Sequence, residues 1–126
     1  MENIILNNGV KMPNLGMGTY LVSPKDAEVT VRESLKMGYR LIDTANAYVN
    51  ERAVGRGIKE SGVDRKEIFL STKLWITEYE NEKAVDETLE RLGLDYIDLL
   101  FIHQPGENYM EGYRKLEKAY KEGKIK

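Results

Sequence analysis

The feature that most constrains the fold is a regular alternation of short apolar segments with longer amphipathic ones. Residues 15–19, 39–45, 68–74 and 96–103 read as strands, and helical patterns over 25–36, 50–61, 80–92 and 109–122 follow them. A glycine closes each helical pattern, at Gly38, Gly62, Gly93 and Gly123. Strands alternating with helices of this length indicate βα units, so we predict an α/β fold with four units on a parallel sheet. The periodicity fits an open sheet and a closed barrel equally well.

A hairpin is predicted ahead of these units. Residues 3–7 and 10–13 flank Asn8-Gly9, a dipeptide typical of a two-residue type I′ turn. Pro13 restricts the second arm to a short or edge strand. At the other end, residues 121–126 have the pattern of an approach to a fifth strand.

The amino-acid composition excludes several kinds of functional site and partner. The 126 residues include 19 Lys and Arg against 21 Asp and Glu, one histidine and no cysteine. The absence of cysteine excludes disulfides, a thiolate nucleophile and Cys-ligated metal, and one histidine makes a zinc site improbable. A net charge of −2 argues against a nucleic-acid binder. The start of the chain lacks the pattern of a signal peptide, and no apolar run reaches the roughly 18 residues of a membrane span, so we expect a cytoplasmic protein without nucleic-acid or membrane partners.

Polar residues follow each predicted strand. Gly18-Thr19-Tyr20 ends the first, Asp43 ends the second with Tyr48 soon after, Lys73 ends the third, and His103 ends the fourth. In parallel α/β folds, ligands bind at the carboxyl ends of the strands. The sequence therefore predicts that these side chains share one mouth.

Each residue also has an ordinary structural interpretation. Asp43 and Lys73 could form an ion pair that closes the sheet, and Tyr48 could be an aromatic residue packed on the rim. His103 could be a satisfied residue at a strand end, and Trp75 could belong to the core. Their occurrence together, one group per strand end, favours a functional site.

The chemistry that the four groups support is proton donation. A tyrosine is a weak acid at neutral pH unless its phenolate is stabilised, which a nearby ammonium does. An aspartate would keep that ammonium in place, and a histidine could orient a carbonyl oxygen. The sequence has no serine or cysteine elbow for acyl transfer, no paired carboxylates for glycoside hydrolysis and no phosphate-binding loop of the P-loop type.

Several motifs together resemble the aldo-keto reductases, in particular the bacterial branch that includes diketogluconate and methylglyoxal reductases. They are Asp43-Thr44-Ala45-Asn46-Ala47-Tyr48, Asn50-Glu51, Val54-Gly55, Ser71-Thr72-Lys73-Leu74-Trp75, Leu94-Asp95-Tyr96-Ile97-Asp98-Leu99 and Ile102-His103-Gln104-Pro105. The segments 6–13 and 15–20 look like the family's hairpin and first strand.

The resemblance implies an eight-stranded (β/α) barrel that reduces aldehydes or ketones with NADPH. Carried over by motif, Tyr48 is the general acid, Lys73 and Asp43 tune it, and His103 orients the carbonyl. The expected cofactor residues are Gly18, Thr19, Tyr20 and Asp43, and the expected substrate residues are Tyr20, Tyr48, Trp75, His103 and Gln104.

Length departs from the family pattern, because a (β/α)8 barrel takes about 250 residues. We therefore expect residues 1–126 to form one domain, the N-terminal half-barrel, with most cofactor contacts in the other half. Exposed strand edges and a bare sheet face are association sites, so we expect self-association. An inactive half-barrel that self-associates is the alternative to the reductase, and a binding protein without turnover is a third hypothesis.

Overall fold

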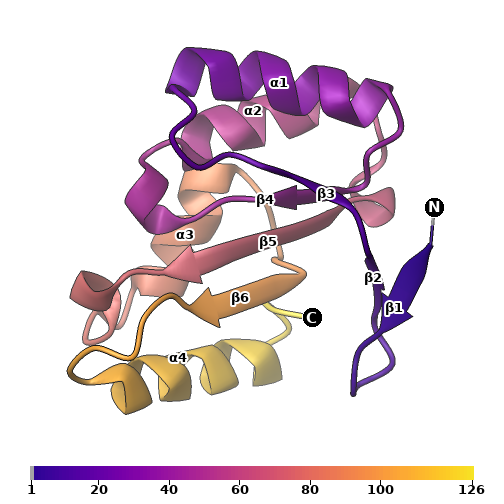
Figure 1. Cartoon of the computed structure of the whole chain (residues 1–126). Helices are drawn as coiled ribbons and strands as arrows, with labels where there is room; N and C mark the ends of the chain where they lie inside the picture. Colours follow the sequence, from indigo (N-terminus) through magenta and orange to yellow (C-terminus); the bar gives the residue numbers. More distant parts are fainter. Residues whose placement is uncertain (1) are drawn as a thin grey trace.

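The structure, a computed structural model, describes residues 2–126. Figure 1 shows two sheets, a short N-terminal hairpin and a four-stranded parallel sheet flanked by helices. The hairpin consists of β1 (Asn3–Ile5) and β2 (Lys11–Pro13), and the parallel sheet has the order β3 (Gly16–Gly18), β4 (Leu41–Asp43), β5 (Phe69–Leu74) and β6 (Leu99–Ile102). The helices are α1 (Pro24–Lys36), α2 (Glu51–Ser61), α3 (Ala84–Leu92) and α4 (Tyr109–Lys121), with 3₁₀ turns η1 (Asn46–Tyr48), η2 (Arg65–Glu67) and η3 (Ile76–Glu78). The prediction of four βα units behind a hairpin is confirmed.

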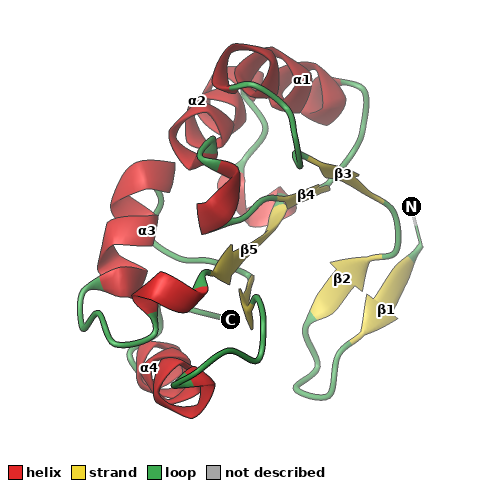
Figure 2. Cartoon of the chain, turned by 60° about the vertical axis from the view of Figure 1, so that its left-hand side comes forward, coloured by secondary structure: helices red, strands yellow, loops and turns green. Residues whose placement is uncertain are grey.

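All four helices pack on one face of the parallel sheet (Figure 2), and the hairpin lies by the N-terminal ends of its strands (Figure 1), where Lys11 and Pro13 line a hollow together with Arg40 and Phe69. Side chains alternate between the faces of a strand, so β5 directs Leu70, Thr72 and Leu74 toward the helices. Its alternate residues Ser71 and Lys73 face the opposite side. The hydrophobic core is therefore confined to the helical side, and the polar groups that concern function lie on the other.

Local sequence explains most helix boundaries. Ser23 caps α1 by accepting a hydrogen bond from the Asp26 amide at 3.2 Å, and Pro24 occupies the first helical position, as predicted. The prediction of a helix from residue 80 is wrong by four residues, because α3 starts at Ala84. Asn81 accounts for the delay: its Oδ1 accepts the Lys83 amide at 3.0 Å, which stabilises a turn instead of a helical first turn.

The hairpin turn differs from the predicted type I′. Its loop has three residues, because the Leu6 amide donates to the Val10 carbonyl at 2.8 Å and the Gly9 amide to the Leu6 carbonyl at 2.9 Å. Gly9 has a φ of +84°, whereas Asn8 does not have the positive φ that a type I′ turn requires there. This is the three-residue loop with glycine in the left-handed position, so Gly9 is needed for a different turn than the sequence indicated.

The parallel sheet continues past β6 by one residue pair. Ile125 pairs in parallel with Ile97, and the Ile97 amide donates to the Lys124 carbonyl at 2.9 Å. Of the expected approach over residues 121–126, the part at 124–126 pairs with the sheet, whereas Lys121 still belongs to α4. Beyond this pair, no strand in residues 2–126 covers the outer edge of β6.

Two glycines let the helices approach closely. A Cβ added to Gly55 in α2 would lie 2.0 Å from the Leu92 carbonyl oxygen at the end of α3. A Cβ on Gly57 would lie 2.6 Å from the Glu28 carbonyl oxygen in α1. These two contacts set how closely α2 packs against α1 and α3. Within residues 2–126, the helices are all too short or too polar to cross a bilayer.

Candidate active site

Lys73, on the open face of β5, is the centre of the candidate site. Its Nζ donates to Asp43 Oδ2 at 2.7 Å and to the Thr44 carbonyl at 2.9 Å. The other carboxylate oxygen of Asp43 accepts the Ser71 hydroxyl at 2.6 Å. The ammonium is thus fixed between the ends of β4 and β5, and the Lys73 and Asp43 side chains are only 18% and 35% exposed. The predicted ion pair exists, with Ser71 as a third member that the sequence did not single out.

Tyr48 lies beside this ion pair in the 3₁₀ turn after β4. The Lys73 Nζ is 5.1 Å from the centre of the Tyr48 ring. Three further rings extend the arrangement: the centroid separations are 5.1 Å for Tyr20–Tyr48, 6.0 Å for Tyr48–His103 and 5.1 Å for His103–Trp75. Each of the four strand ends therefore contributes a ring to one continuous row, and the structure brings the side chains that were expected to share one mouth to the same place.

His103 is held by its backbone and surrounded by rings. Its amide donates to the Leu74 carbonyl at 3.1 Å, which continues the β5–β6 ladder by one residue. Burial lowers the pKa of His103 below its usual value, and the Lys73 charge lowers it further, while Asp43 opposes this shift. The ring is therefore biased toward the neutral form. Its Nδ1 is buried and has no hydrogen-bond partner within residues 2–126.

A buried polar cluster supports the turn that carries Tyr48 from the helical side. Glu51, 3% exposed at the start of α2, accepts the Thr72 hydroxyl at 2.8 Å and the Arg91 Nε at 2.9 Å. Asn46, the first residue of the turn, donates to Glu51 Oε1 at 3.0 Å and to the Thr88 hydroxyl at 3.2 Å. The cluster joins α2, β5 and α3 behind the site. Three of its members, Asn46, Glu51 and Thr72, lie in motifs quoted from the sequence, but nothing in those motifs indicated that they bond to one another.

The expected substrate residues lie in two settings. Trp75 packs edge-on to His103 and is half-buried. The Gln104 side chain is exposed, and its backbone is fixed by Tyr79, whose hydroxyl donates to the Gln104 carbonyl at 2.5 Å and accepts the Gln104 amide at 3.2 Å. Tyr79 is fully buried, so this contact anchors the loop after β6, a role that no sequence pattern indicated.

The expected cofactor residues follow β3. Gly18 is exposed, and a Cβ added there would meet nothing within 4 Å, so the surface above the end of β3 is open. Tyr20 is 64% exposed next to it. Thr19 is fully buried, and its hydroxyl donates to the Asp43 carbonyl at 3.1 Å, so its side chain is already engaged. The surface at the end of β3 is open and lies beside the exposed Tyr20 ring and the Lys73–Asp43 ion pair. These features suit the planar nicotinamide ring of a cofactor.

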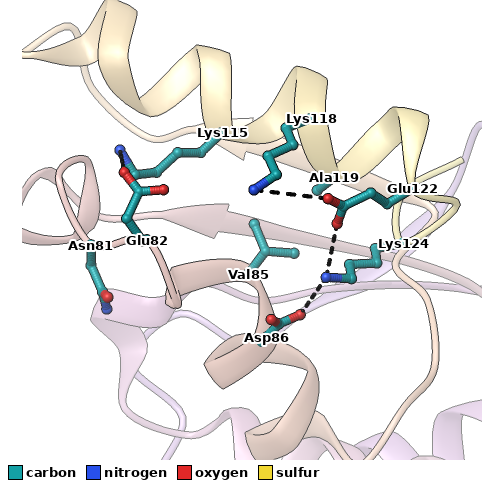
Figure 3. A pocket seen from close by; sticks show the side chains of 9 residues that line it. All are labelled: Asn81, Glu82, Val85, Asp86, Lys115, Lys118, Ala119, Glu122 and Lys124. Atoms are coloured by element: carbon teal, nitrogen blue, oxygen red, sulfur yellow. Dashed lines mark ion pairs between the residues drawn. The ribbon is translucent and has the colours of Figure 1, made fainter.

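A hollow of about 100 Å³ between α3 and α4 lies on the helical side (Figure 3). Its cations are engaged by acidic residues: Lys124 binds Asp86 at 2.8 Å and Glu122 at 2.9 Å, and Lys115 lies 3.4 Å from Glu82. The carboxylates, Asp86 first, raise the pKa of Lys124. Charges that neutralise one another leave little to attract a ligand, so we assign this hollow to helix packing.

The comparisons with known proteins agree with this geometry. The profile of the Aldo/keto reductase family matches residues 13–126, and the chain belongs to this family. Glyoxal reductase of Bacillus subtilis is 48% identical over 99% of the chain and 47% of its own length. Methylglyoxal reductase of Escherichia coli is 39% identical over 98% of the chain and 46% of its own length. The chain thus spans about half the length of the curated relatives it matches, and the resemblance to this bacterial branch is confirmed.

Solved structures give the same relationship. An aldo/keto reductase from Brucella melitensis superposes with a TM-score of 0.94 at 44% identity, covering 98% of the chain and 50% of that protein. An aldo-keto reductase from Bombyx mori, solved in complex with NADP, superposes with a TM-score of 0.91 at 34% identity, covering 98% of the chain and 48% of that protein. The hairpin and four βα units are therefore the N-terminal half of a (β/α)8 barrel.

Proposed function

We propose that residues 1–126 form the half-barrel domain that carries the proton-donating site of an NADPH-dependent reductase of aldehydes or ketones, with Tyr48 as the proton donor. The observation that carries this proposal is the Lys73–Asp43 ion pair, with the ammonium 5.1 Å from the Tyr48 ring and His103 beyond it. No simpler structural role requires one such group from each strand end.

The residues around Tyr48 have separate roles in the proposed reaction. Lys73 stabilises the phenolate that forms when Tyr48 gives up its proton, and Asp43 holds the ammonium in place. A neutral His103 can direct Nε2 toward a carbonyl oxygen and hold it near the Tyr48 hydroxyl. Proton donation and carbonyl orientation are then separate tasks on opposite sides of the same small space.

NADPH supplies the hydride when bound. The residues that would hold its nicotinamide end are Gly18, Thr19, Tyr20 and Asp43: Gly18 leaves room, Tyr20 offers a ring face, and Thr19 holds the Asp43 backbone. The substrate class that we propose is a small carbonyl compound, since the relatives include a glyoxal reductase and a methylglyoxal reductase. Tyr20, Trp75 and Gln104 would line its approach, with Tyr48 and His103 at the reacting carbonyl.

The test of this proposal uses the 126-residue chain. NADPH is titrated while the fluorescence of Trp75, the only tryptophan, is recorded, and glyoxal is then added and NADPH oxidation followed. Tyr48→Phe is expected to lower kcat at least ~100-fold and to leave NADPH affinity within about twofold, because only the proton donor is removed. Full activity in this variant would show that Tyr48 is not the acid.

The second candidate function is that of a self-associating half-barrel without turnover. The uncovered edge of β6 favours it, together with Phe101, which is 42% exposed on the open side of the sheet. A second copy could offer its own β3 edge in parallel orientation and cover both open faces. The two candidates differ in their readouts, since association is measured without cofactor.

A further inference from the structure

Asn50 lies two residues after Tyr48, and its side chain is buried and hydrogen-bonded within the protein. The residue is 2% exposed. Its Oδ1 accepts the Thr44 hydroxyl at 2.8 Å, and its Nδ2 donates to the carbonyls of Thr19 at 2.9 Å and Val22 at 3.1 Å. Asparagine supplies one carbonyl and two N–H donors, so both donors and the carbonyl are in use.

These bonds join two loops that reach the site from different strands. The bond from Thr44 to Asn50 closes the base of the loop that holds Tyr48. The two bonds from Nδ2 hold the β3–α1 loop, residues 19–22, against that base. Helix α2 does not need this side chain for its own first turn, because Asn50 makes no side-chain cap.

The two loops that Asn50 joins carry Tyr20 and Tyr48, whose ring centroids are 5.1 Å apart. Tyr20 is mostly exposed, so side-chain packing alone does not hold it. The next residue, Leu21, has a φ of +59°, which is unfavourable for leucine and requires support from its surroundings. The Nδ2 bonds to Thr19 and Val22 lie on both sides of this strained residue and provide that support.

We propose that Asn50 is a positioning residue that clasps the β3–α1 loop to the base of the Tyr48 loop and so sets the distance between Tyr20 and Tyr48 across the mouth of the site. Its importance for catalysis rests on the proposed function. Its structural effect does not, so the test below uses readouts that are independent of turnover.

The test compares three variants. Asn50→Ala removes all three bonds, and Thr44→Val removes only the bond that closes the Tyr48 loop. Ser61→Ala is the matched control: Ser61 is also a buried polar residue of α2, and its hydroxyl donates to the Ile58 carbonyl at the opposite end of the helix. The unfolding free energy of each variant is measured first, so that global destabilisation can be subtracted.

The first readout is amide hydrogen exchange. In Asn50→Ala, exchange at Val22, Tyr48 and Val49, whose amides bond within the two loops, is expected to rise at least tenfold beyond the global change. In Thr44→Val, Tyr48 and Val49 should respond while Val22 stays protected. In Ser61→Ala, none of the three should respond beyond the global change.

The second readout is the nuclear Overhauser contact between the rings of Tyr20 and Tyr48. It should disappear in Asn50→Ala and persist in Ser61→Ala, while methyl signals of the core remain in place. Exchange that rises uniformly along the chain, or a ring contact that survives in Asn50→Ala, would overturn the proposal. If Asn50→Ala does not fold, selective loosening of residues 48 and 49 in Thr44→Val still supports the clasp, and its absence refutes it. Lack of reductase activity would count against the proposed function and leave these readouts unchanged.

Discussion

Lys73 and Asp43 form a hydrogen-bonded ion pair at 2.7 Å that joins the ends of two adjacent parallel strands on the open face of the sheet. The same ammonium donates to the Thr44 carbonyl, and the same carboxylate accepts the Ser71 hydroxyl. The pair thus has a fixed geometry, which an isolated surface ion pair lacks. This rigidity is what a proton-donating site requires of the group that stabilises its phenolate.

Asp43→Asn is the substitution that isolates this relationship. The amide keeps the shape of the carboxylate and removes its charge, so Lys73 loses its ionic partner and keeps only neutral acceptors, such as the Thr44 carbonyl. We expect the free energy of unfolding to fall by about 1–2 kcal/mol, because both side chains are partly shielded from water. Arg114→Gln, which breaks the exposed Arg114–Glu111 pair, is the control and should leave the urea midpoint unchanged. Equal effects of the two substitutions would contradict a special role for the Asp43 pair.

Gly55→Ala tests the close approach of α2 and α3. The new Cβ would lie 2.0 Å from the Leu92 carbonyl oxygen, which is backbone and cannot rotate away. We expect a loss of about 3 kcal/mol of stability, measured by urea unfolding. Gly18→Ala, where a Cβ meets nothing within 4 Å, should change stability by less than about 1 kcal/mol. A Gly55→Ala variant as stable as the parent would show that the helices do not depend on this contact.

The lowered pKa of His103 makes stability depend on pH. Burial and Lys73 disfavour the imidazolium, so the folded state binds fewer protons than the unfolded state once the pH falls through the usual value near 6.5. The stability that the neutral ring provides is therefore present above that pH and is lost as the pH falls toward the lower, folded-state pKa. His103→Gln removes the only histidine, so the drop in unfolding free energy between pH 7.5 and pH 5 should be smaller in the variant. Identical drops in both proteins would show that His103 is not shielded.

Phe101→Glu tests self-association. A carboxylate on the open face of β6 should weaken association of the chain at least tenfold, because it introduces a charge where a second copy would bury an apolar ring. Sedimentation velocity at micromolar concentrations measures the effect. Met37→Glu is the control, since Met37 is 74% exposed just after α1, away from the sheet edge. A compact monomer for the parent chain, or equal behaviour of both variants, would reject this interface.

The βα order could be predicted from the sequence because it depends on local patterns. Periodicity and glycine stops located every unit, and Ser23-Pro24 identified the start of α1. The alignment of polar groups at strand ends followed from parallel topology, so Asp43, Lys73 and His103 could be placed together before their distances were known.

The supporting contacts could not be predicted, because they depend on three-dimensional packing between distant segments. Asn50 reaches Thr19 across 31 residues, and Tyr79 reaches Gln104 across 25. The hairpin turn was misassigned because Asn-Gly is compatible with more than one loop length, and only the hydrogen bonds of Leu6 and Gly9 select the three-residue loop. Patterns of residue type identify the strand ends, whereas the contacts that hold those ends in place appear only once the chain is folded.

The single ladder pair between Ile97 and Ile125 has a consequence for how the chain acquires its structure. Each strand from β4 onward pairs with the strand that precedes it in the sequence. Ile125 likewise pairs with Ile97, which lies just before β6. The sheet can therefore extend in one direction as the ribosome delivers the polypeptide, with every new unit meeting a ready template and no need to wait for a distant partner.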